Sequence, residues 1–167
     1  MERRKDDGKY NCLMRWLSLI LLVCAPVPVL AEDWRGSVRV VDGDTLAISD
    51  ARLRLIAIDA PEGAQTCQNA QQRDYDCGRE ATRELERLIG GREVRCSGDK
   101  RDRYGRALVV CFTGEINLNA AMVRSGWAVT YLGHDFERDE AEARAAKRGL
   151  WGGTFQRPAD WRKDHPR

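Results

Sequence analysis

The first half of the chain contains short runs in which apolar and polar positions alternate, a pattern that is typical of β-strands. Residues 37–48 hold two such runs around Asp42-Gly43, a pair that favours a tight hairpin turn with a positive φ angle. The segment 52–59 begins with alternation and continues as an unbroken apolar run that ends at Asp59. Three strands are therefore predicted between residues 37 and 59.

Helical spacing of apolar positions appears after the strands. Residues 78–90 place their apolar side chains on one face and stop at two glycines. The other predicted elements are strands at 92–96 and 106–112 and helices at 116–126 and 136–151. Residues 63–77 are polar and predict a long loop.

The order of these elements predicts the fold class. Three strands, a helix, two strands and further helices fit an α+β, mainly β fold, namely a five-stranded OB-type Greek-key barrel with about three packed helices. The predicted barrel domain covers residues 32–157, and residues 158–167 are expected to form a flexible tail.

The first 31 residues carry the pattern of a secretory signal peptide. Basic residues precede the apolar run 16–30, and Val29-Leu30-Ala31 resembles a small-residue cleavage site before a charged segment. The run is shorter than the roughly 20 residues that a membrane span needs. Met14 is an alternative start, because it would give a more compact signal. We therefore expect a secreted or periplasmic protein with no stable membrane span after cleavage.

Removal of this segment changes the charge balance. The full chain has 28 Lys and Arg against 26 Asp and Glu, whereas residues 32–167 hold 23 of each kind. A nearly neutral domain cannot attract nucleic acid through a global basic field, so any such contact depends on local arginine clusters. We expect a monomer.

Four cysteines remain in the predicted domain, and an even count in an exported protein indicates two disulfides. Cys67 and Cys77 bracket the polar loop, while Cys96 and Cys111 fall on the two strands around the charged loop. We therefore predict Cys67–Cys77 and Cys96–Cys111 over the two crossed pairings. The sequence offers few ligands for zinc and few residues for Cys-His catalysis, since it has no C-x-x-C pair and only two histidines.

Charged residues recur where strand ends and loops would meet. They are Asp42, Asp44, Arg54, Asp59, Glu62 and Arg106. Taken singly, most have an ordinary explanation, because Asp favours turns and charge runs favour solvent. Arg54 is harder to explain in this way, since an arginine inside an apolar strand needs a partner such as Asp44 or Asp59. Together they suggest a site for metal and acid–base chemistry.

Five segments carry a family resemblance. They are VVDGDTLAI, RLRLIAIDAPE, CGREATRELERLI, DRYGRALVVCF and LNAAMVRSGWA, and they have the order and approximate spacing of the staphylococcal nuclease (thermonuclease-like) family. The chain resembles an exported, cysteine-containing member of this family over about residues 36–151. The resemblance implies an OB-type barrel and calcium-dependent hydrolysis of phosphodiester bonds in DNA, RNA or both, with little sequence specificity.

The resemblance also implies roles for individual residues. Asp44 and Asp59 match the carboxylate ligands of calcium (Ca²⁺), and the backbone carbonyl of Ala60 stands where the founding enzyme uses that of a threonine. Glu62 matches the general base. The remaining matches are Arg54 and Arg106 at the phosphate-binding arginines and, more loosely, Asp42, Arg103 and Tyr104 near the metal or nucleotide. The cysteines and the 63–77 loop depart from the founding enzyme.

Elementary chemistry agrees with these roles, because hard oxygen ligands without nearby His or Cys favour calcium or magnesium over zinc. Arg54 and Asp59 pose a difficulty, since residues five apart on an ideal strand point to opposite faces. A bulge or bend is required between them. Two alternatives remain open, a catalytically silent OB-type module that binds nucleic acid or protein and a disulfide-stapled structural domain.

Overall fold

The computed structural model describes residues 32–166. The predicted signal peptide, residues 1–31, and the alternative start at Met14 lie outside the described residues. No helix between residues 32 and 166 is long and apolar enough to cross a membrane.

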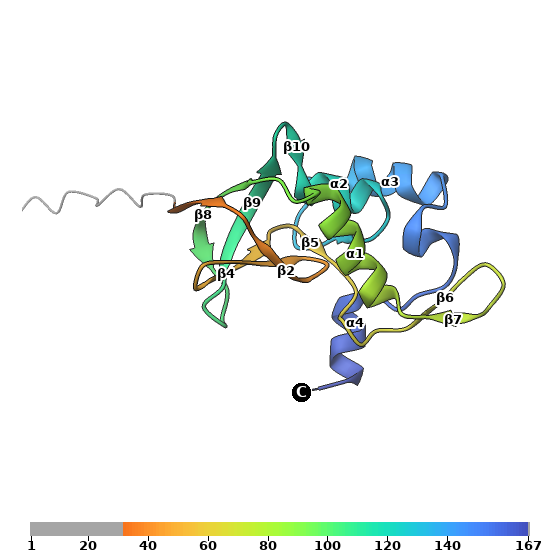
Figure 1. Cartoon of the computed structure of the whole chain (residues 1–167). Helices are drawn as coiled ribbons and strands as arrows, with labels where there is room; N and C mark the ends of the chain where they lie inside the picture. The colour runs from red at the N-terminus through yellow and green to blue at the C-terminus, as the bar shows by residue number, and fades with distance from the viewer. Residues whose placement is uncertain (1–31, 167) are drawn as a thin grey trace, which may run out of the picture.

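A curled sheet forms the body of the molecule (Figure 1). Its strands are β1 (Glu32–Gly36), β2 (Arg39–Asp42), β3 (Thr45–Ile48), β4 (Ala51–Leu55), β8 (Val94–Arg101), β9 (Ala107–Thr113) and β10 (Ile116–Asn117). The order is β1-β8-β9-β4-β3-β2, with β10 beside β9. Only the β4–β9 pair is parallel among these described strands, and it joins the two halves of the chain. The predicted mainly β, OB-like fold is confirmed.

Four α-helices and a 3-10 turn surround this sheet in the described part of the chain (Figure 1). They are α1 (Cys77–Ile89), α2 (Leu118–Arg124), α3 (Glu137–Ala145), η1 (Gly149–Gly152) and α4 (Pro158–Asp164). Helix α1 forms where the apolar period predicts it and buries Ala81, Leu85 and Ile89. It ends at Gly90, whose φ of 59° is the left-handed conformation that glycine adopts easily.

The predicted strand over 52–59 is broken in two. Strand β4 ends at Leu55, Ala57 has a φ of 63°, and the short strand β5 (Ile58–Asp59) then pairs with β11 (Val129–Thr130). This turn supplies the bend that the positions of Arg54 and Asp59 require. The chain thus changes direction between the two side chains instead of running straight through them.

A buried amide fixes the position of this bend. Asn119 on α2 is fully buried and donates from Nδ2 to the carbonyl oxygens of Ile56 (3.0 Å) and Val109 (3.1 Å). Its Oδ1 accepts from the Cys111 amide at 3.1 Å. The sequence pattern gave no sign of this role, because the polar residue stands in an apolar helix. The amide thus joins the backbone on both sides of the break, adding a second hydrogen bond to the Val109 carbonyl, which also accepts from the Ile56 amide.

Both disulfides join the predicted partners. Cys96 and Cys111 face each other in the antiparallel register of β8 and β9, with 4.1 Å between their Cα atoms. Cys67 and Cys77 close the polar loop, which contains the two short strands β6 (Cys67–Gln68) and β7 (Asp74–Tyr75). The Cys67–Cys77 bond packs with Leu150 in a small hydrophobic cluster that is separate from the core of the sheet.

The end of the chain differs from the sequence prediction. Residues 158–164 form helix α4, where a flexible tail was expected. Pro158 stands in the first turn, a position that its fixed φ angle favours, and Arg162 projects from the helix to the carboxylates described below. The strongly polar composition of the segment is typical of a tail and does not by itself indicate this helix.

Candidate active site

The hairpin between β2 and β3 buries a carboxylate. Asp44 stands in the turn and has only 3% of its surface exposed, and its amide donates to Asp42 Oδ1 at 3.1 Å. The expectation that Gly43 provides a positive φ angle is wrong, because its φ is negative. Gly43 is needed for space, since a Cβ atom there would lie 2.7 Å from Ala60 Cβ and 2.8 Å from Ala81 Cβ. The missing side chain lets the turn pack directly on α1.

Arg54 connects two buried carboxylates. Its NH1 donates to Asp44 Oδ1 at 2.6 Å, and its NH2 donates to Asp59 Oδ1 at 2.8 Å. The Asp59 side chain is 1% exposed and the Arg54 side chain 13%, so both ion pairs are shielded from solvent. The bend at Ala57 allows this contact between residues five positions apart. The structure therefore brings Asp44, Arg54 and Asp59 together.

Burial changes the acidity of this cluster. Desolvation raises the pKa of Asp44 to about 7, although Arg54 and the Ala60 amide favour its ionised form. The Ala60 amide donates to Asp44 Oδ2 at 3.0 Å, so Ala60 also lies beside this carboxylate. Asp44 and Asp59 raise the pKa of Arg54, although its burial has the opposite effect. A second positive charge near Asp44 would therefore be strongly favoured.

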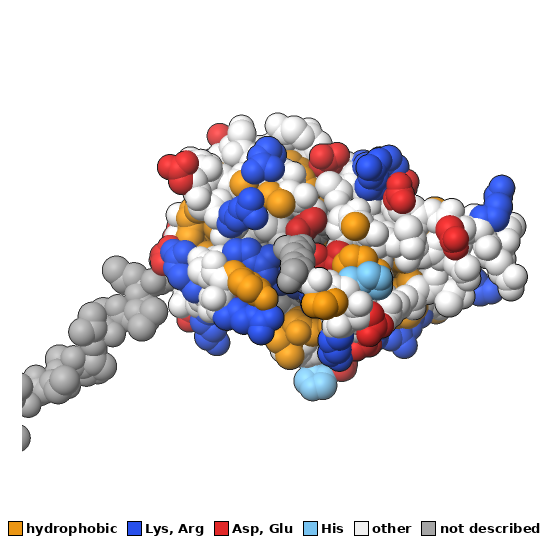
Figure 2. Space-filling model, turned by 90° about the horizontal axis from the view of Figure 1, so that it is seen from below, with side chains coloured by type: hydrophobic (Ala, Val, Ile, Leu, Met, Phe, Trp, Pro, Cys, Tyr) orange, Lys and Arg blue, Asp and Glu red, His pale blue; other side chains and the backbone are white. Residues whose placement is uncertain are grey.

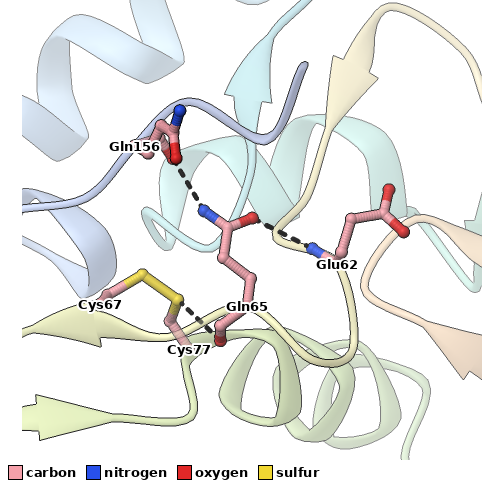
Figure 3. The surroundings of a disulfide bond; sticks show 5 residues. All are labelled: Glu62, Gln65, Cys67, Cys77 and Gln156. Carbon is pink, nitrogen blue, oxygen red and sulfur yellow. Dashed lines mark hydrogen bonds between the residues drawn. A yellow bond between two sulfur atoms is a disulfide. The ribbon is translucent and has the colours of Figure 1, made fainter. Parts of the chain in front are cut away.

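Glu62 follows β5 and is held by a turn that leads to the disulfide (Figure 3). The Gln65 amide donates to the Glu62 carbonyl at 2.7 Å, and the Glu62 amide donates to Gln65 Oε1 at 3.3 Å. Gln65 is fully buried, and its Nε2 donates to the Gln156 carbonyl at 2.8 Å. In Figure 3 the Glu62 carboxylate points away from Cys67 and Cys77, so the disulfide supports the backbone of Glu62 and not its acid group.

Helix α1 also fixes the backbone of Glu62. A Cβ atom on Gly78 would lie 1.9 Å from the Glu62 carbonyl oxygen, which is far closer than any real contact. The first turn of α1 thus rests on the main chain of Glu62. Sequence reasoning assigned no function to Gly78 or Gln65, because their effect on Glu62 depends on contacts between elements that the sequence does not reveal.

Arg162 joins the cluster from helix α4. Its NH1 donates to Asp59 Oδ1 and to Glu62 Oε1, both at 2.9 Å, and its NH2 donates to Asp59 Oδ2 at 3.1 Å. The Arg162 side chain is one third exposed. This residue was missed at the sequence level, where its segment was interpreted as a tail. Within the described residues the cluster therefore contains two guanidinium groups next to three carboxylates.

Arg106 is linked to the cluster through the hydroxyl of one intervening residue, Thr45. Its Nε donates to Asp102 Oδ2 at 2.7 Å, and its NH1 lies 3.4 Å from Thr45 Oγ1, whose hydroxyl donates to Asp44 Oδ1 at 3.1 Å. The structure thus links Arg106 to Asp44 through Thr45 but does not bring it into direct contact with the carboxylates.

Arg103 and Tyr104 lie at the tip of the same loop, between β8 and β9. Arg103 NH2 donates to the Tyr104 hydroxyl at 2.7 Å, and the guanidinium groups of Arg103 and Arg106 lie 4.8 Å and 5.7 Å from the centre of the Tyr104 ring. The tyrosine is 69% exposed. Figure 2 views the end of the molecule where this loop and α4 lie, and basic side chains gather there beside acidic ones.

The donor chemistry of the cluster suits a hard cation. Asp44 and Asp59 offer carboxylate oxygens, a ligand type that calcium and magnesium prefer. The backbone carbonyl of Ala60 is also a hard oxygen, but the contact that the structure shows at Ala60 is its amide on Asp44. Between residues 32 and 166 no group of three or more His, Cys, Asp or Glu side chains is close enough to hold a metal ion by itself. A cation here would therefore depend on two carboxylates, the carbonyl and water, and it would meet the arginines that already bind these oxygens.

Comparison with known proteins gives a consistent result. The family described as staphylococcal nuclease homologue matches residues 52–153. An uncharacterized endonuclease of Escherichia coli O157:H7 is 36% identical over 149 residues, which cover 83% of this chain and 90% of that protein. A micrococcal nuclease of Shigella flexneri is 33% identical over 171 residues, covering 90% and 92%. Protein ParB of Escherichia coli is 33% identical over 184 residues, covering 98% and 96%.

Proposed function

The chain belongs to the staphylococcal nuclease homologue family, and from this premise we propose that it is a calcium-dependent nuclease that hydrolyses DNA, RNA or both outside the cytoplasm. The nuclease names of its relatives support the chemistry at the level of the family. The calcium ion, the roles of individual residues and the location are the finer parts of this proposal.

The observation that carries the proposal is the contact of Arg54 with both Asp44 and Asp59, with Glu62 held next to them through Arg162. A structural ion pair needs one carboxylate for one guanidinium. Here three carboxylates converge with two guanidiniums at one end of the barrel, and a buried charge cluster of this kind costs stability and is typical of functional sites.

Asp44, Asp59 and the carbonyl of Ala60 are the proposed calcium ligands. A bound calcium ion would polarise a phosphoryl oxygen and neutralise charge on the transferring group. Few protein ligands imply weak binding, which suits an ion that is abundant outside the cell. Burial raises the pKa of Asp44, so a positive neighbour would favour its ionised form.

Glu62 is the proposed general base. Its carboxylate stands at the edge of the cluster with 15% of the side chain exposed, so a water molecule can reach it from solvent. There it would orient the water and accept its proton as the water attacks phosphorus. The rigid support from Gln65 and Gly78 would keep this carboxylate in position relative to Asp59.

Arg54 and Arg106 are the proposed phosphate-binding groups. A guanidinium offers a planar fork that matches two non-bridging phosphate oxygens, and the contact strengthens as charge builds up in the transition state. Arg106 reaches the site from the loop side and Arg54 from the barrel. Arg103 and Tyr104 would add contacts to the sugar, base face or backbone. Such a site reads phosphate and sugar, so low sequence specificity is expected.

The disulfides support the proposed location. Bonds such as Cys67–Cys77 and Cys96–Cys111 persist in oxidising compartments and are rare in the cytosol. They agree with the signal pattern at residues 1–31. A periplasmic or secreted protein fits both observations, and we expect it to act as a monomer.

Degradation of end-labelled DNA and RNA by the purified protein tests the proposal. Cleavage should occur with calcium and stop when a chelator is added, and the Glu62→Gln variant purified in parallel excludes a contaminating nuclease. Binding of nucleic acid without cleavage in calcium would support the silent OB-type module instead. Undiminished cleavage in chelator would reject the calcium requirement while leaving nuclease activity.

A further inference from the structure

Helix α4 places a guanidinium on the carboxylates that are proposed to bind the cation and activate water. Arg162 contacts Asp59 with two nitrogens, NH1 at 2.9 Å and NH2 at 3.1 Å, and the same NH1 reaches Glu62 at 2.9 Å. The family match ends at residue 153, before this helix begins. Arg162 is therefore a site residue that lies beyond the matched segment.

These contacts use both oxygens of Asp59. Oδ1 accepts from Arg54 and Arg162, while Oδ2 accepts from Arg162. The carboxylate has 1% of its side-chain surface exposed, so it cannot turn outward to offer an oxygen elsewhere. A divalent cation and the Arg162 fork would need the same oxygens and carry charge of the same sign. Oδ1 already accepts two hydrogen bonds, and a cation on Oδ2 would lie beside the Arg162 guanidinium, so the two positive groups compete for Asp59.

We propose that Arg162 is a positioning residue that competes with the divalent cation for Asp59 and Glu62, so that α4 closes the site until the cation displaces its guanidinium. This inference rests on the proposed function. In the closed state Arg162 neutralises the buried carboxylates and occupies the carboxylate of the proposed base. In the open state the cation replaces Arg162 at Asp59, and the Glu62 carboxylate loses its contact with this guanidinium.

The attachment of α4 permits such a displacement. The helix has seven residues, and only Pro158 is buried. Its other ties are polar and near its ends, such as Gln156 Nε2 to Asp164 Oδ2 at 2.6 Å and Arg157 NH2 to the Thr130 carbonyl at 3.1 Å. Apart from Pro158, the apolar contacts of the helix come from the partly buried Ala159 and Trp161, so less apolar surface holds α4 than holds the helices of the core. An element with few buried apolar contacts is one that opens at low cost.

Competition and a purely structural role predict opposite changes in calcium affinity when Arg162 is removed. When the binding-competent state is only partly populated, the apparent dissociation constant rises in proportion. Removal of Arg162 should therefore tighten cation binding, whereas loss of a residue that merely supports the fold would weaken it or leave it unchanged. Charge-assisted contacts of this kind would close the site in most molecules, so a gain on the order of tenfold to a hundredfold is expected.

Calorimetric titration with calcium, in the absence of nucleic acid, tests this in three variants of the full protein. Arg162→Ala should bind calcium on the order of tenfold or more tightly than the wild type. Arg162→Lys should show a smaller gain, because an ammonium keeps the charge without the two parallel N–H bonds. Lys163→Ala is the matched control, since it removes one positive charge from α4 at a side chain that is 74% exposed and pairs with Asp160 instead of the cluster.

The outcomes separate this inference from the function it rests on. Equal calcium affinity in the wild type, Arg162→Ala and Lys163→Ala would overturn the competition, while calcium-dependent cleavage by the same wild-type sample would leave the proposed function intact. Equal tightening in Arg162→Ala and Lys163→Ala would reduce the effect to net charge and also overturn it. Calcium binding to none of the proteins would reject the inference and the calcium site together. Circular dichroism confirms that each variant is folded.

Discussion

The buried carboxylate cluster and the β8–β9 loop both present arginines to the proposed substrate, but they hold them differently. Arg54 is enclosed and bonded to Asp44 and Asp59, which come from separate elements of the barrel. Arg106 is bonded to Asp102, four residues away on its own loop, and it also contacts the Tyr104 ring of that loop and, at 3.4 Å, Thr45 Oγ1. Arg54 therefore connects separate elements of the barrel, whereas Arg106 is held mainly by its own loop.

This difference predicts which properties can be changed separately. Removing a partner from a buried ion pair leaves a charge without compensation and costs about 3–5 kcal/mol. The Arg106–Asp102 pair lies within one loop and is partly buried, with side chains 22% and 16% exposed, and pairs that keep contact with solvent are typically worth about 0–1 kcal/mol. Substitutions of Asp44, Arg54 or Asp59 should therefore alter stability and activity together, while those in the loop and at Glu62, on the edge of the cluster, should alter mainly activity. The following substitutions test that contrast.

Glu62→Gln should cause the largest change in activity. The amide keeps the shape and an acceptor for Arg162, so the free energy of unfolding should stay within about 1 kcal/mol of the wild type. Turnover should fall by about 10²–10⁴-fold, because the basic oxygen is lost. Initial rates on labelled DNA in saturating calcium measure the effect.

The exposed carboxylate of Glu115, in the turn between β9 and β10, gives a matched control. Glu115→Gln removes the same charge far along the chain from the cluster, and it should leave turnover unchanged. Normal turnover in Glu62→Gln would remove this residue as the base and leave the proposed mechanism without one.

Arg54→Lys and Arg106→Lys compare the two regions directly. Both should reduce kcat by about 10²–10³-fold, because an ammonium cannot reproduce the planar fork that stabilises the transition state. Arg54→Lys should also lower the free energy of unfolding by about 1–3 kcal/mol, since a buried hydrogen bond to Asp44 or Asp59 is lost. Arg106→Lys should change it by less than about 0.5 kcal/mol.

Urea denaturation of the two lysine variants provides the stability measurement. Equal stability losses in Arg54→Lys and Arg106→Lys would contradict the distinction between the cluster and the loop. The activity losses are compared in the same preparations, so that unfolded protein is not mistaken for slow chemistry.

Loss of the Cys67–Cys77 bond should separate stability from calcium dependence. The bond closes a loop of 10 residues, and chain-entropy reasoning gives a stabilisation on the order of 2–3 kcal/mol. The double variant Cys67→Ser/Cys77→Ser should therefore unfold at lower urea concentration, while the calcium concentration for half-maximal cleavage should change less than threefold. A large shift in calcium dependence would mean that the disulfide controls the site itself and not only the backbone of Glu62.

Much of this architecture could be predicted from the sequence because it depends on local pattern. Strand alternation, the period of α1 and the positions of the cysteines are each contained in one stretch of chain, and the two disulfide partners follow from them. The need for a bend between Arg54 and Asp59 also followed from strand geometry, and the structure places it at Ala57.

The parts that could not be predicted depend on contacts between distant segments. Arg162 lies 103 positions from Asp59, and no local pattern relates a charged C-terminal segment to a strand end. Gln65 and Gly78 are similar, since their effect on Glu62 exists only when the loop and α1 pack together. Gly43 has a typical turn sequence, but close packing against Ala60 and Ala81, not its φ angle, explains the glycine.

Asp102→Asn should give the smallest effect and depend on pH. Burial opposes the ionisation of Asp102, but hydrogen bonds from the Arg106 side chain and amide and from the Tyr104 amide outweigh it and lower the pKa of this carboxyl below its usual value. A folded-state pKa below the unfolded value adds stability that is present above about pH 4 and is lost as the pH falls through the folded-state pKa. Because the loop is near the surface, this contribution should be less than about 1 kcal/mol.

The pH dependence of unfolding tests this last expectation against a control on the neighbouring strand. Asp102→Asn should be slightly less stable than the wild type at pH 7, and the two curves should converge below about pH 4, where the unfolded wild type is protonated. Asp99→Asn, at an exposed position of β8, should follow the wild type throughout. Since Asp102 holds Arg106, cleavage at pH 7 should also fall modestly. A difference that persisted at acid pH would show that the asparagine disturbs the shape of the loop independently of charge. Substitutions in the loop would then alter the stability of the fold, as those in the buried cluster are expected to do.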